Sequence, residues 1–564
     1  MISNETIAKN FSLLSKLMEI HGENPFKIKS YANVVRIIEK YPKAFSELSH
    51  NEIASIKGIG EAIAQKILDQ IATGRLPLLD KYLNETPKGI VEMLQIKGLG
   101  AKKVQTIWKD LGIENLGELL YACNENRLLH YKGFGEKTQE NIRQAIEFYQ
   151  QSQGLFLYAQ VDNVAKSIHE ELLKTFPSNT FLICGKYREQ QEIIEQLEWV
   201  TDCSISELKS FTEKKNWTDK GSTEGIGLFS TEENIQISLF IYPKDQLAFQ
   251  QFERTGSQDF LEAWKKEFPF SEGEVFQTEE EIFQKAGTAI IPPYLRDFPE
   301  VIQKAKTNQI PDVIQTKEIK GIIHSHSNWS DGANTLREMA QYVKSLGLEY
   351  LVISDHSQSA FYANGLKPDR VLEQHKEIDQ LNQELAPFHI FKSIESDILY
   401  NGDLDYPDEV LDSFDLIIAS VHSILKMDEE KATSRILAAV ANPYTSILGH
   451  MTGRLLLSRA GYPVDHDKII KACQENDVVI ELNAHPRRLD IDWRWLYRAL
   501  DNGIITSINP DAHSTEGCHV IQYGVSVGQK AGLTSKQNLS SFSLEEMHAF
   551  VAKQKSKRKN NHGQ

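Results

Sequence analysis

The stretch that begins His324-Ser325-His326 holds residue types that bind transition metals. A carboxylate, Asp331, follows five positions after the second histidine. Imidazole nitrogens and carboxylate oxygens are the ligands used by zinc, manganese and iron sites. More residues of these two types follow at wide intervals: His356, Glu395, His422, His450, Asp511 and His513. Because clustered metals activate water at neutral pH, such a set predicts hydrolysis of phosphoesters.

Short apolar runs precede these side chains and predict that the side chains gather at one place in the fold. The run Ile322-Ile323 leads into His324, and residues 416–421 lead into His422. Seven such runs alternate with helical segments from Glu318 onward, which predicts an α/β barrel. In such a barrel the C-terminal strand ends face one mouth, where catalytic residues gather. One histidine at a strand end can be structural, but seven polar endings in order predict a metal centre.

Other polar residues near these runs carry weaker predictions. Asp355 is expected to orient His356 or a barrel loop rather than to bind metal. Arg454 can either meet a phosphate or form a salt bridge within its loop, and the sequence favours neither. His485 and His519 are expected to be ordinary surface or supporting groups.

The first 150 residues repeat one short pattern three times. In each copy a lysine precedes two glycines that flank an apolar residue: Lys57, Gly58 and Gly60; Lys97, Gly98 and Gly100; Lys132, Gly133 and Gly135. Glycine permits tight turns and close approach of another backbone, and the helix start that follows presents N–H groups to a phosphate. The pattern predicts hairpins that grip the DNA backbone without reading bases. The alternative is that the glycines only make tight turns between helices.

Composition narrows the class of protein. At 564 residues the chain is expected to form three or four domains. Its net charge of −16 argues against a surface covered throughout with nucleic-acid-binding residues, although residues 1–150 are nearly neutral. The five cysteines show no paired spacing, which indicates a reduced compartment. We find neither a signal segment nor an apolar run long enough for a membrane span, so a cytoplasmic protein is expected.

The C-terminal set resembles the PHP (polymerase and histidinol phosphatase) family. The positions that match its metal motifs are His324-x-His326, Asp331-Gly332, Asp355-His356, Glu395, His422, His450 and Asp511-x-His513. The resemblance implies a distorted (β/α)7 barrel that holds three divalent ions, Mn²⁺, Zn²⁺ or Fe²⁺. It implies a first ion on the residues that would be catalytic: His324, His326, Glu395 and Asp511. It implies a second ion on Glu395, His422 and His450, and a third on Asp331, His356 and His513.

The N-terminal region resembles family X DNA polymerases. Residues 24–31 read Asn-Pro-Phe-Lys-Ile-Lys-Ser-Tyr, like the start of that family's small domain, and the glycine repeats resemble its helix-hairpin-helix motifs. In some members a lysine one turn after the first hairpin acts as a Schiff-base nucleophile on abasic sugar phosphates. Lys66 stands at that place. The alternative is a solvated lysine on a helix face, because an amine needs a lowered pKa to act.

Residues 151–312 resemble the palm and thumb of the same family. The resemblance runs through residues 252–257, 279–283 and 291–296. It implies an α+β nucleotidyltransferase-like fold between the helical N-terminal region and the PHP barrel, and hence a multidomain protein.

The residues that polymerase chemistry needs are missing from this region. Nucleotide addition requires two magnesium ions held by three aspartates on adjacent strands. Gln196-Leu197-Glu198 replaces the family's Asp-x-Asp, and Ser238 stands for the third aspartate. We therefore expect a polymerase-like scaffold with a degenerate active site, unless a gap in the alignment brings Glu195 or Asp202 into it.

The sequence predicts five consecutive parts. They are a small helical domain with the first hairpin (1–85), further hairpins (86–150), the palm and thumb (151–312), the PHP domain (318–550) and a basic, disordered tail (551–564). The tail could alternatively bind phosphate.

The leading hypothesis is a DNA-binding, metal-dependent phosphoesterase of DNA repair. It would be a 3′→5′ exonuclease or a 3′-end trimming enzyme that acts on gapped, nicked or other 3′-end substrates. Three alternatives stay open: an active gap-filling DNA polymerase of base excision repair, a small-molecule phosphatase of the histidinol-phosphatase type, and a DNA-binding scaffold without catalysis.

Overall fold

The chain folds into two compact units. The computed structural model describes residue 2 and residues 4–41, 43–96, 98–151, 154–271 and 274–561. One unit comprises Met1–Asn124 and Leu128–Glu147, and the other comprises Glu125–Arg127 and Phe148–Gln564. The finer division into five parts stays a prediction. Among the described residues, no helix is both long and apolar enough to cross a membrane.

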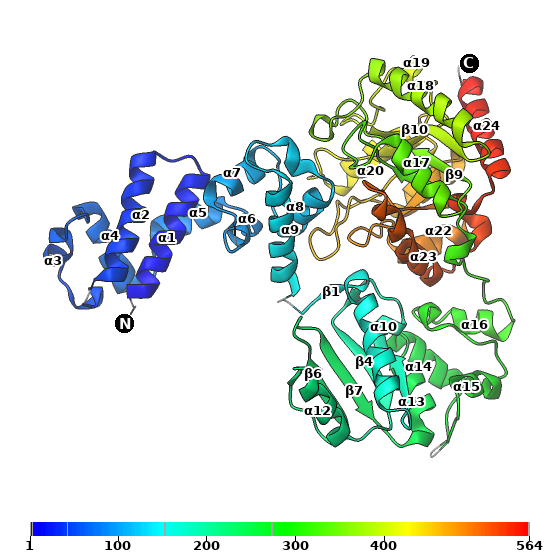
Figure 1. Cartoon of the computed structure of the whole chain (residues 1–564), viewed down its shortest axis with the longest axis horizontal. Helices are drawn as coiled ribbons and strands as arrows, with labels where there is room; N and C mark the ends of the chain where they lie inside the picture. Colours follow the sequence, from blue (N-terminus) through cyan, green and yellow to red (C-terminus); the bar gives the residue numbers. More distant parts are fainter. Residues whose placement is uncertain are drawn as a thin grey trace. The chain divides into compact units, whose positions relative to one another are not determined.

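The described residues of the first unit form helices, coloured blue to cyan in Figure 1, and the last of these helices extends four residues into the second unit. These helices are α1 (Asn4–Ile20), α2 (Pro25–Lys40), α3 (His50–Ser55), α4 (Glu61–Thr73), α5 (Pro77–Glu85), α6 (Lys88–Met93), α7 (Ala101–Lys109), α8 (Leu116–Asn124) and α9 (Glu136–Gln151). Local sequence sets their ends. Helix α3, for example, begins with a reciprocal capping box between Ser49 and Glu52. The expected helical N-terminal region is therefore confirmed.

The second unit begins with a five-stranded mixed sheet. Its strand order is β2 (Phe181–Cys184), β4 (Gln196–Thr201), β7 (Gln236–Ile241), β6 (Ile226–Ser230) and β5 (Thr218–Asp219). Strands β4 and β7 are parallel and the other neighbours are antiparallel. Helices α10 (Tyr158–Thr175) and α12 (Ile205–Lys214) share one apolar core with the sheet, around Trp199. This is the predicted α+β palm-like fold.

Four helices with a separate apolar core follow the sheet. They are α13 (Leu247–Glu253), α14 (Gln258–Glu267), α15 (Glu279–Ala286) and α16 (Val301–Lys306). Phe252 and Trp264 lie fully buried at the centre of this core. The helices occupy the part of the chain that resembles a polymerase thumb.

Seven parallel strands form the C-terminal barrel, in chain order from one end of the sheet to the other. The strands are β8 (Gly321–Ser325), β9 (Tyr350–Ile353), β10 (His389–Asp397), β11 (Leu416–Ser420), β12 (Ile447–Leu448), β13 (Val479–Asn483) and β14 (Thr506–Asn509). Helices connect them, as Figure 1 shows: α17 (Leu336–Ser345), α18 (Pro368–Leu385), α19 (Asp408–Leu411), α20 (Glu429–Ala441), α21 (His466–Glu475), α22 (Trp493–Asp501) and, after β14, α23 (Ile521–Lys530). The predicted α/β barrel is confirmed.

Successive residues of the barrel strands face opposite sides, as the pleat requires. Ile322 and Ile417 pack into the core shared with the surrounding helices. Their neighbours Ile323 and Ile418 belong to a second core, which includes Met547 of the last helix. Continuous apolar strands are thus explained by burial of both faces.

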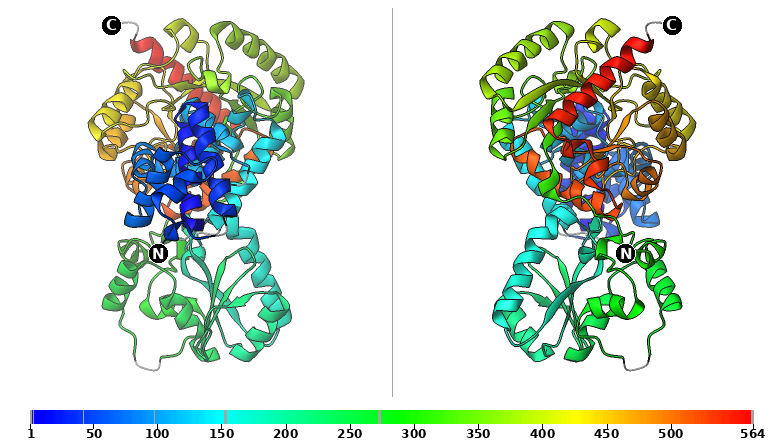
Figure 2. Two further views of the ribbon diagram at one scale, coloured as in Figure 1. Left: turned by 90° about the vertical axis from the view of Figure 1, so that its left-hand side faces the viewer. Right: turned by 90° about the vertical axis from the view of Figure 1, so that its right-hand side faces the viewer.

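The basic C-terminal segment is ordered up to residue 561, which corrects the expectation of a disordered tail. It continues helix α24 (Leu544–Asn561), the red helix that runs across the barrel in Figure 2. Arg558 is buried and donates to the carbonyl of Phe414 at 2.8 Å, while Lys557 donates to the carbonyl of Thr445 at 2.9 Å. Phe414 and Thr445 lie just before β11 and β12. The basic residues therefore attach α24 to the barrel. Residues 562–564 lie outside the described part.

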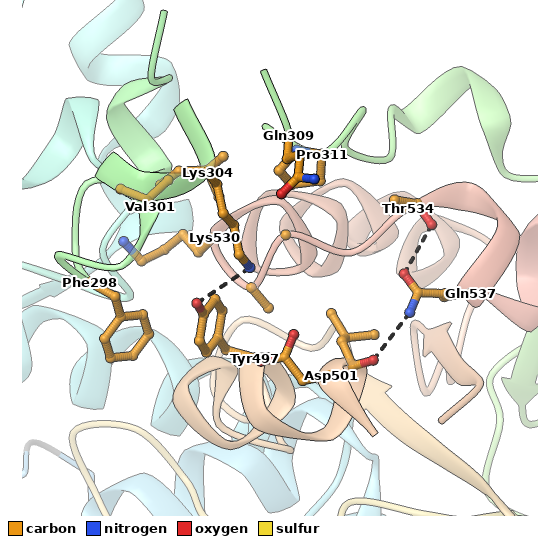
Figure 3. Close-up of a pocket in the computed structure, with 14 residues that line it drawn as sticks. Phe298, Val301, Lys304, Gln309, Pro311, Tyr497, Asp501, Lys530, Thr534 and Gln537 are labelled. Atoms are coloured by element: carbon orange, nitrogen blue, oxygen red, sulfur yellow. Dashed lines mark hydrogen bonds between the residues drawn. The ribbon is translucent and has the colours of Figure 1, made fainter. Parts of the chain in front are cut away.

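A buried lysine joins the barrel to the polymerase-like part of the same unit. The Lys530 side chain has no exposed area, and its ammonium donates to the carbonyl of Glu189 at 2.9 Å and pairs with Asp297. A buried charge is costly unless it is paired. Beside it lies a cavity of about 240 Å³, shown in Figure 3, where the Lys304 ammonium lies 3.5 Å from the Tyr497 hydroxyl. The cavity contains none of the predicted metal ligands.

Candidate metal centre

Closure of the barrel brings the first and last strands together. The amide of His326 donates to the carbonyl of Ala512 at 2.8 Å, and Ser325 forms a parallel bridge with Ala512. Two predicted ligands at this junction, His324 and Asp511, have φ values of +61° and +53°. Non-glycine residues adopt this left-handed conformation rarely, and such strained positions cluster at functional sites.

Glu395, near the end of β10, lies at the centre of the predicted ligands. Its Oε1 lies 3.0 Å from Nε2 of His422 and 3.0 Å from Nε2 of His450. Its Oε2 lies 3.0 Å from Nδ1 of His356. Nε2 of His324 lies 3.3 Å from Oε1. Nε2 of His326 lies 3.7 Å from Oε2. One carboxylate therefore faces five imidazoles, an arrangement that suits a bridging ligand.

Asp331 is the centre of a second group. Its Oδ1 lies 3.5 Å from Nε2 of His513 and 3.9 Å from Nδ1 of His326, and its Oδ2 lies 3.6 Å from Nε2 of His356. Oδ1 of Asp511 lies 3.2 Å from Nε2 of His326, which links this group to the first. The structure thus gathers all nine predicted ligands into one buried cluster.

The cluster fits divalent metal ions. Among the described residues, seven of the nine carry a buried nitrogen or oxygen that makes no hydrogen bond: His324, His326, Asp331, His356, Glu395, His450 and His513. Buried polar groups in proteins nearly always have hydrogen-bond partners. Ligand atoms from four of these residues lie within 4.8 Å of one another: His326, Asp331, His356 and His513. Imidazole and carboxylate donors at this spacing provide a site for divalent metal.

The carboxylates counteract the effect of burial on the imidazoles. Burial lowers the pKa of His422, but Glu395 and Asp397 outweigh burial and raise it to about 10. Burial likewise lowers the pKa of His513, and Asp331 raises it to about 10. Without metal these imidazoles hold protons that an ion must displace, so metal binding is expected to weaken as the pH falls.

Two buried carboxylates that we did not predict support the ligands. Oε2 of Glu481 lies 2.6 Å from Nδ1 of His324, and Asp397 is hydrogen-bonded to Nδ1 of His422. Such partners fix the tautomer and orientation of a metal-binding imidazole. Both carboxylates lie in the buried C-terminal parts of strands, β13 and β10. A carboxylate near the end of a barrel strand is the sequence signal that could have identified them.

We expect Glu481→Gln to weaken metal affinity by about 10- to 100-fold, because the supporting carboxylate loses its charge while its shape is kept. Calorimetric titration of the metal-stripped protein with Mn²⁺ measures this. Glu475→Gln is the matched control, because that side chain is 61% exposed on α21. Equal affinities in the two variants would contradict the role of Glu481.

Asp355 has the supporting role that its position suggested. Its carboxylate accepts from the amide and hydroxyl of Ser327 at 2.8 and 2.7 Å. It also accepts from the hydroxyl of Ser330 at 2.5 Å and from the amide of Gln374 at 2.6 Å. These bonds hold the loop that carries Asp331.

Arg454 is a salt-bridged loop residue, and its contacts do not support the phosphate-binding role. Its Nε donates to the carbonyl of Arg488 at 2.9 Å, its Nη1 pairs with Asp492, and its Nη2 donates to a further carbonyl. Each guanidinium nitrogen therefore already has an acceptor. His485 and His519 make hydrogen bonds outside the ligand groups, as expected.

The three glycine repeats form hairpins with the same backbone conformation. The first glycines have φ values of 99°, 93° and 98°, a region that L side chains rarely adopt: Gly58, Gly98 and Gly133. The apolar residues between the glycines are buried: Ile59, Leu99 and Phe134. The second glycines are exposed and directly precede α4, α7 and α9: Gly60, Gly100 and Gly135. Each hairpin therefore exposes a helix start, as expected for phosphate contact.

The structure describes two of the three lysines that precede the hairpin glycines. Lys57 and Lys132 are exposed beside their glycines, whereas Lys97 lies outside the described residues. The Lys66 ammonium donates to the carbonyl of Ala62, one turn earlier in its own helix, at 3.1 Å. Lyase chemistry at Lys66 stays a prediction.

The polymerase-like sheet brings together the three positions at which we expected lost carboxylates. Glu198 on β4 pairs in register with Ser238 on β7. Gln196 accepts a hydrogen bond from the Ser238 hydroxyl at 3.0 Å and donates to the Glu198 carboxylate at 3.0 Å. Burial raises the pKa of Glu198. One carboxylate beside an amide and a hydroxyl cannot neutralise two magnesium ions.

Neither alternative carboxylate enters that site. Glu195 is 58% exposed and pairs with Lys186 at 2.9 Å, and Asp202 accepts from the amide of Thr180 at 2.6 Å. In the described part of the chain, Glu198 belongs to no cluster of metal-ligand atoms. The structure therefore agrees with a degenerate polymerase site.

The fold and the metal centre together define a DNA-binding, metal-dependent phosphoesterase. Comparisons with known proteins agree. The family described as "Helix-hairpin-helix domain" matches residues 2–76, and "SAM-like Helix-hairpin-helix tandem" matches residues 90–147.

Relatives that match almost the whole chain or only part of it extend the comparison. The chain is 31% identical over 565 residues to "DNA polymerase/3'-5' exonuclease PolX" of Bacillus subtilis, covering 97% of this chain and 98% of that protein. A "Probable phosphatase" of Acetivibrio thermocellus is 30% identical over 166 residues, covering 29% of this chain and 64% of that protein. A "Probable phosphatase" of Thermoanaerobacter sp. is 26% identical over 228 residues, covering 37% and 86%. The chain belongs to the PolX family, the bacterial family X DNA polymerases with a C-terminal PHP domain.

Proposed function

We propose that the chain is a 3′→5′ exonuclease that trims 3′ ends during DNA repair, with three divalent ions in the PHP domain and no templated polymerase activity. The observation that carries the proposal is the contrast between two sites in one unit. All nine PHP ligands lie in one buried cluster around Glu395. The polymerase-like site keeps only Glu198 where three carboxylates are needed.

The residues of the metal centre have different roles in phosphodiester hydrolysis. Divalent ions held by the nine ligands would supply an activated water and neutralise charge on the phosphate oxygens. Glu395 contacts five of the imidazoles, and Asp331 contacts a partly separate set. Glu481 and Asp397 hold His324 and His422 in position. No serine or cysteine nucleophile is required.

The hairpin region supports a DNA substrate rather than a small phosphate ester. Exposed glycines at three helix starts suit contact with the sugar-phosphate backbone, which does not depend on sequence. The relative that covers almost the whole chain is named for polymerase and 3′-5′ exonuclease activity, whereas the probable phosphatases cover only its C-terminal part. We infer that gapped, nicked and recessed 3′ ends are the substrates.

The test is degradation of 3′-recessed DNA labelled at the 5′ end, with purified protein and Mn²⁺. We expect a ladder that shortens from the 3′ end, and none with His324→Ala. Equal products from wild type and His324→Ala, or no degradation at all, would contradict the proposal.

The same preparations distinguish the alternatives. Faster turnover of histidinol phosphate than of DNA would indicate a small-molecule phosphatase. Templated dNTP addition that survives His324→Ala but not Glu198→Ala would indicate an active polymerase. DNA binding without any metal-dependent cleavage would indicate a scaffold.

A further inference from the structure

The loop after β9 holds one tyrosine against the metal centre. A short turn, η6 (Phe361–Ala363), follows the predicted ligand His356. The amide of Leu366 donates back to the carbonyl of His356 at 2.8 Å. A Cβ at Gly365 would lie 1.9 Å from the Ser357 carbonyl, so the return path is tightly packed. The loop is therefore fixed on both sides of the turn.

The side chain of Tyr362 lies beside His356, one of the predicted metal ligands. Its ring centroid lies 6.3 Å from that of His356, in an edge-on arrangement. The hydroxyl oxygen is buried and, among the described residues, makes no hydrogen bond. A buried hydroxyl without a hydrogen-bond partner is destabilising, so this hydroxyl is suited to donate to a bound ligand.

The nearby carboxylates have other roles: Asp397 accepts hydrogen bonds, and Glu395 is a predicted metal ligand. Asp397 is hydrogen-bonded to Nδ1 of His422 and accepts from the hydroxyl of Ser359 at 2.9 Å. Glu395 faces the imidazoles described above. A phenol has an ordinary pKa of about 10 and at neutral pH is a hydrogen-bond donor. The partner that suits it is an anionic acceptor bound beside the metal centre.

We propose that Tyr362 contacts the substrate by donating a hydrogen bond from its hydroxyl to a non-bridging oxygen of the phosphate in the metal centre. This inference rests on the proposed function and adds a specific contact to it. The group recognised is the phosphate itself, so inorganic phosphate and a nucleoside monophosphate are both suitable probes. Hydrogen bonds to charged groups are stronger than neutral ones, which gives the contact a measurable effect.

The test compares two tyrosine-to-phenylalanine variants of the Mn²⁺-loaded protein. Tyr362→Phe should bind inorganic phosphate about 10- to 100-fold more weakly and lower kcat/KM on DNA by a similar factor. Its thermal midpoint should not fall, because the free protein loses no hydrogen bond. Tyr350→Phe is the control, because that hydroxyl donates to the carbonyl of Leu539 at 3.1 Å inside the barrel. It should lower the thermal midpoint and leave phosphate binding unchanged.

The outcomes separate this contact from the proposed function. Unchanged phosphate affinity in Tyr362→Phe would overturn the contact, even if the protein is an exonuclease. A loss of bound Mn²⁺ from Tyr362→Phe would also overturn it, since the residue would then support the metal site. If wild type binds phosphate through Tyr362 but does not degrade DNA, the contact stands and the exonuclease proposal fails.

Discussion

Replacing Glu395 by glutamine is expected to abolish measurable hydrolysis of DNA 3′ ends. The side chain keeps its shape but loses the negative charge that faces five imidazoles. Even the loss of a group that only supports a metal ligand costs about 10- to 100-fold in affinity or activity. A carboxylate at the centre of the cluster should therefore cost more than about 100-fold in kcat/KM.

Metal content should fall together with activity in Glu395→Gln. Elemental analysis of the purified variant, beside the labelled-DNA assay, measures both. Glu384→Gln is the matched control, because its carboxylate is 39% exposed and pairs with Arg337 on the helical surface. A Glu395→Gln protein with full metal content and wild-type rates would show that the cluster is not the catalytic centre.

The second large effect is expected on stability, at Glu279 of the polymerase-like part. Its carboxylate lies 2.9 and 2.7 Å from two nitrogens of Arg188, and 2.7 and 3.0 Å from two nitrogens of Arg296. Arg296 is fully buried. Removing one partner of a buried pair costs about 3–5 kcal/mol, because the remaining charge is left uncompensated. Glu279→Gln should lower the free energy of unfolding by about that amount.

The contribution of Glu279 also depends on pH. Burial raises the pKa of Glu279, but Arg188 and Arg296 outweigh burial and lower it to about 2. A carboxyl with a lowered folded-state pKa stabilises the protein above its unfolded-state pKa, about 4.3. That stabilisation is lost as the pH falls from there through about 2. The difference between wild type and Glu279→Gln should therefore shrink in this acid range.

Denaturant unfolding at neutral and acid pH measures both effects. Glu280→Gln is the control, because the neighbouring side chain is exposed on the same helix. A difference between wild type and Glu279→Gln that stays constant from neutral pH to pH 2 would contradict the assigned ion pairs. A large effect would explain why the polymerase-like part keeps its fold although its metal-binding carboxylates are gone.

Patterns within short segments were sufficient to predict several features of this protein. The apolar runs before His324 and His422 end within two residues of the ends of β8 and β11, because a buried parallel strand needs continuous apolar residues. The Lys-Gly-x-Gly repeats form hairpins because only glycine adopts the required backbone readily. The nine ligands could be identified because few other residue types bind divalent metal.

Tertiary structure decided which distant segments contact one another. Asp511 meets His326, 185 positions away, only because the barrel closes. Glu481 supports His324 through a contact that no local pattern encodes, and the same holds for the basic residues of α24. Composition suggested a disordered tail there, whereas carbonyls near the strand entrances supply partners for Arg558. Sequence thus determined which groups are available and which backbone shapes are allowed, because those properties are local. Which carboxylate pairs with which imidazole or guanidinium was decided by packing, because these partners become neighbours only when the strands and helices assemble.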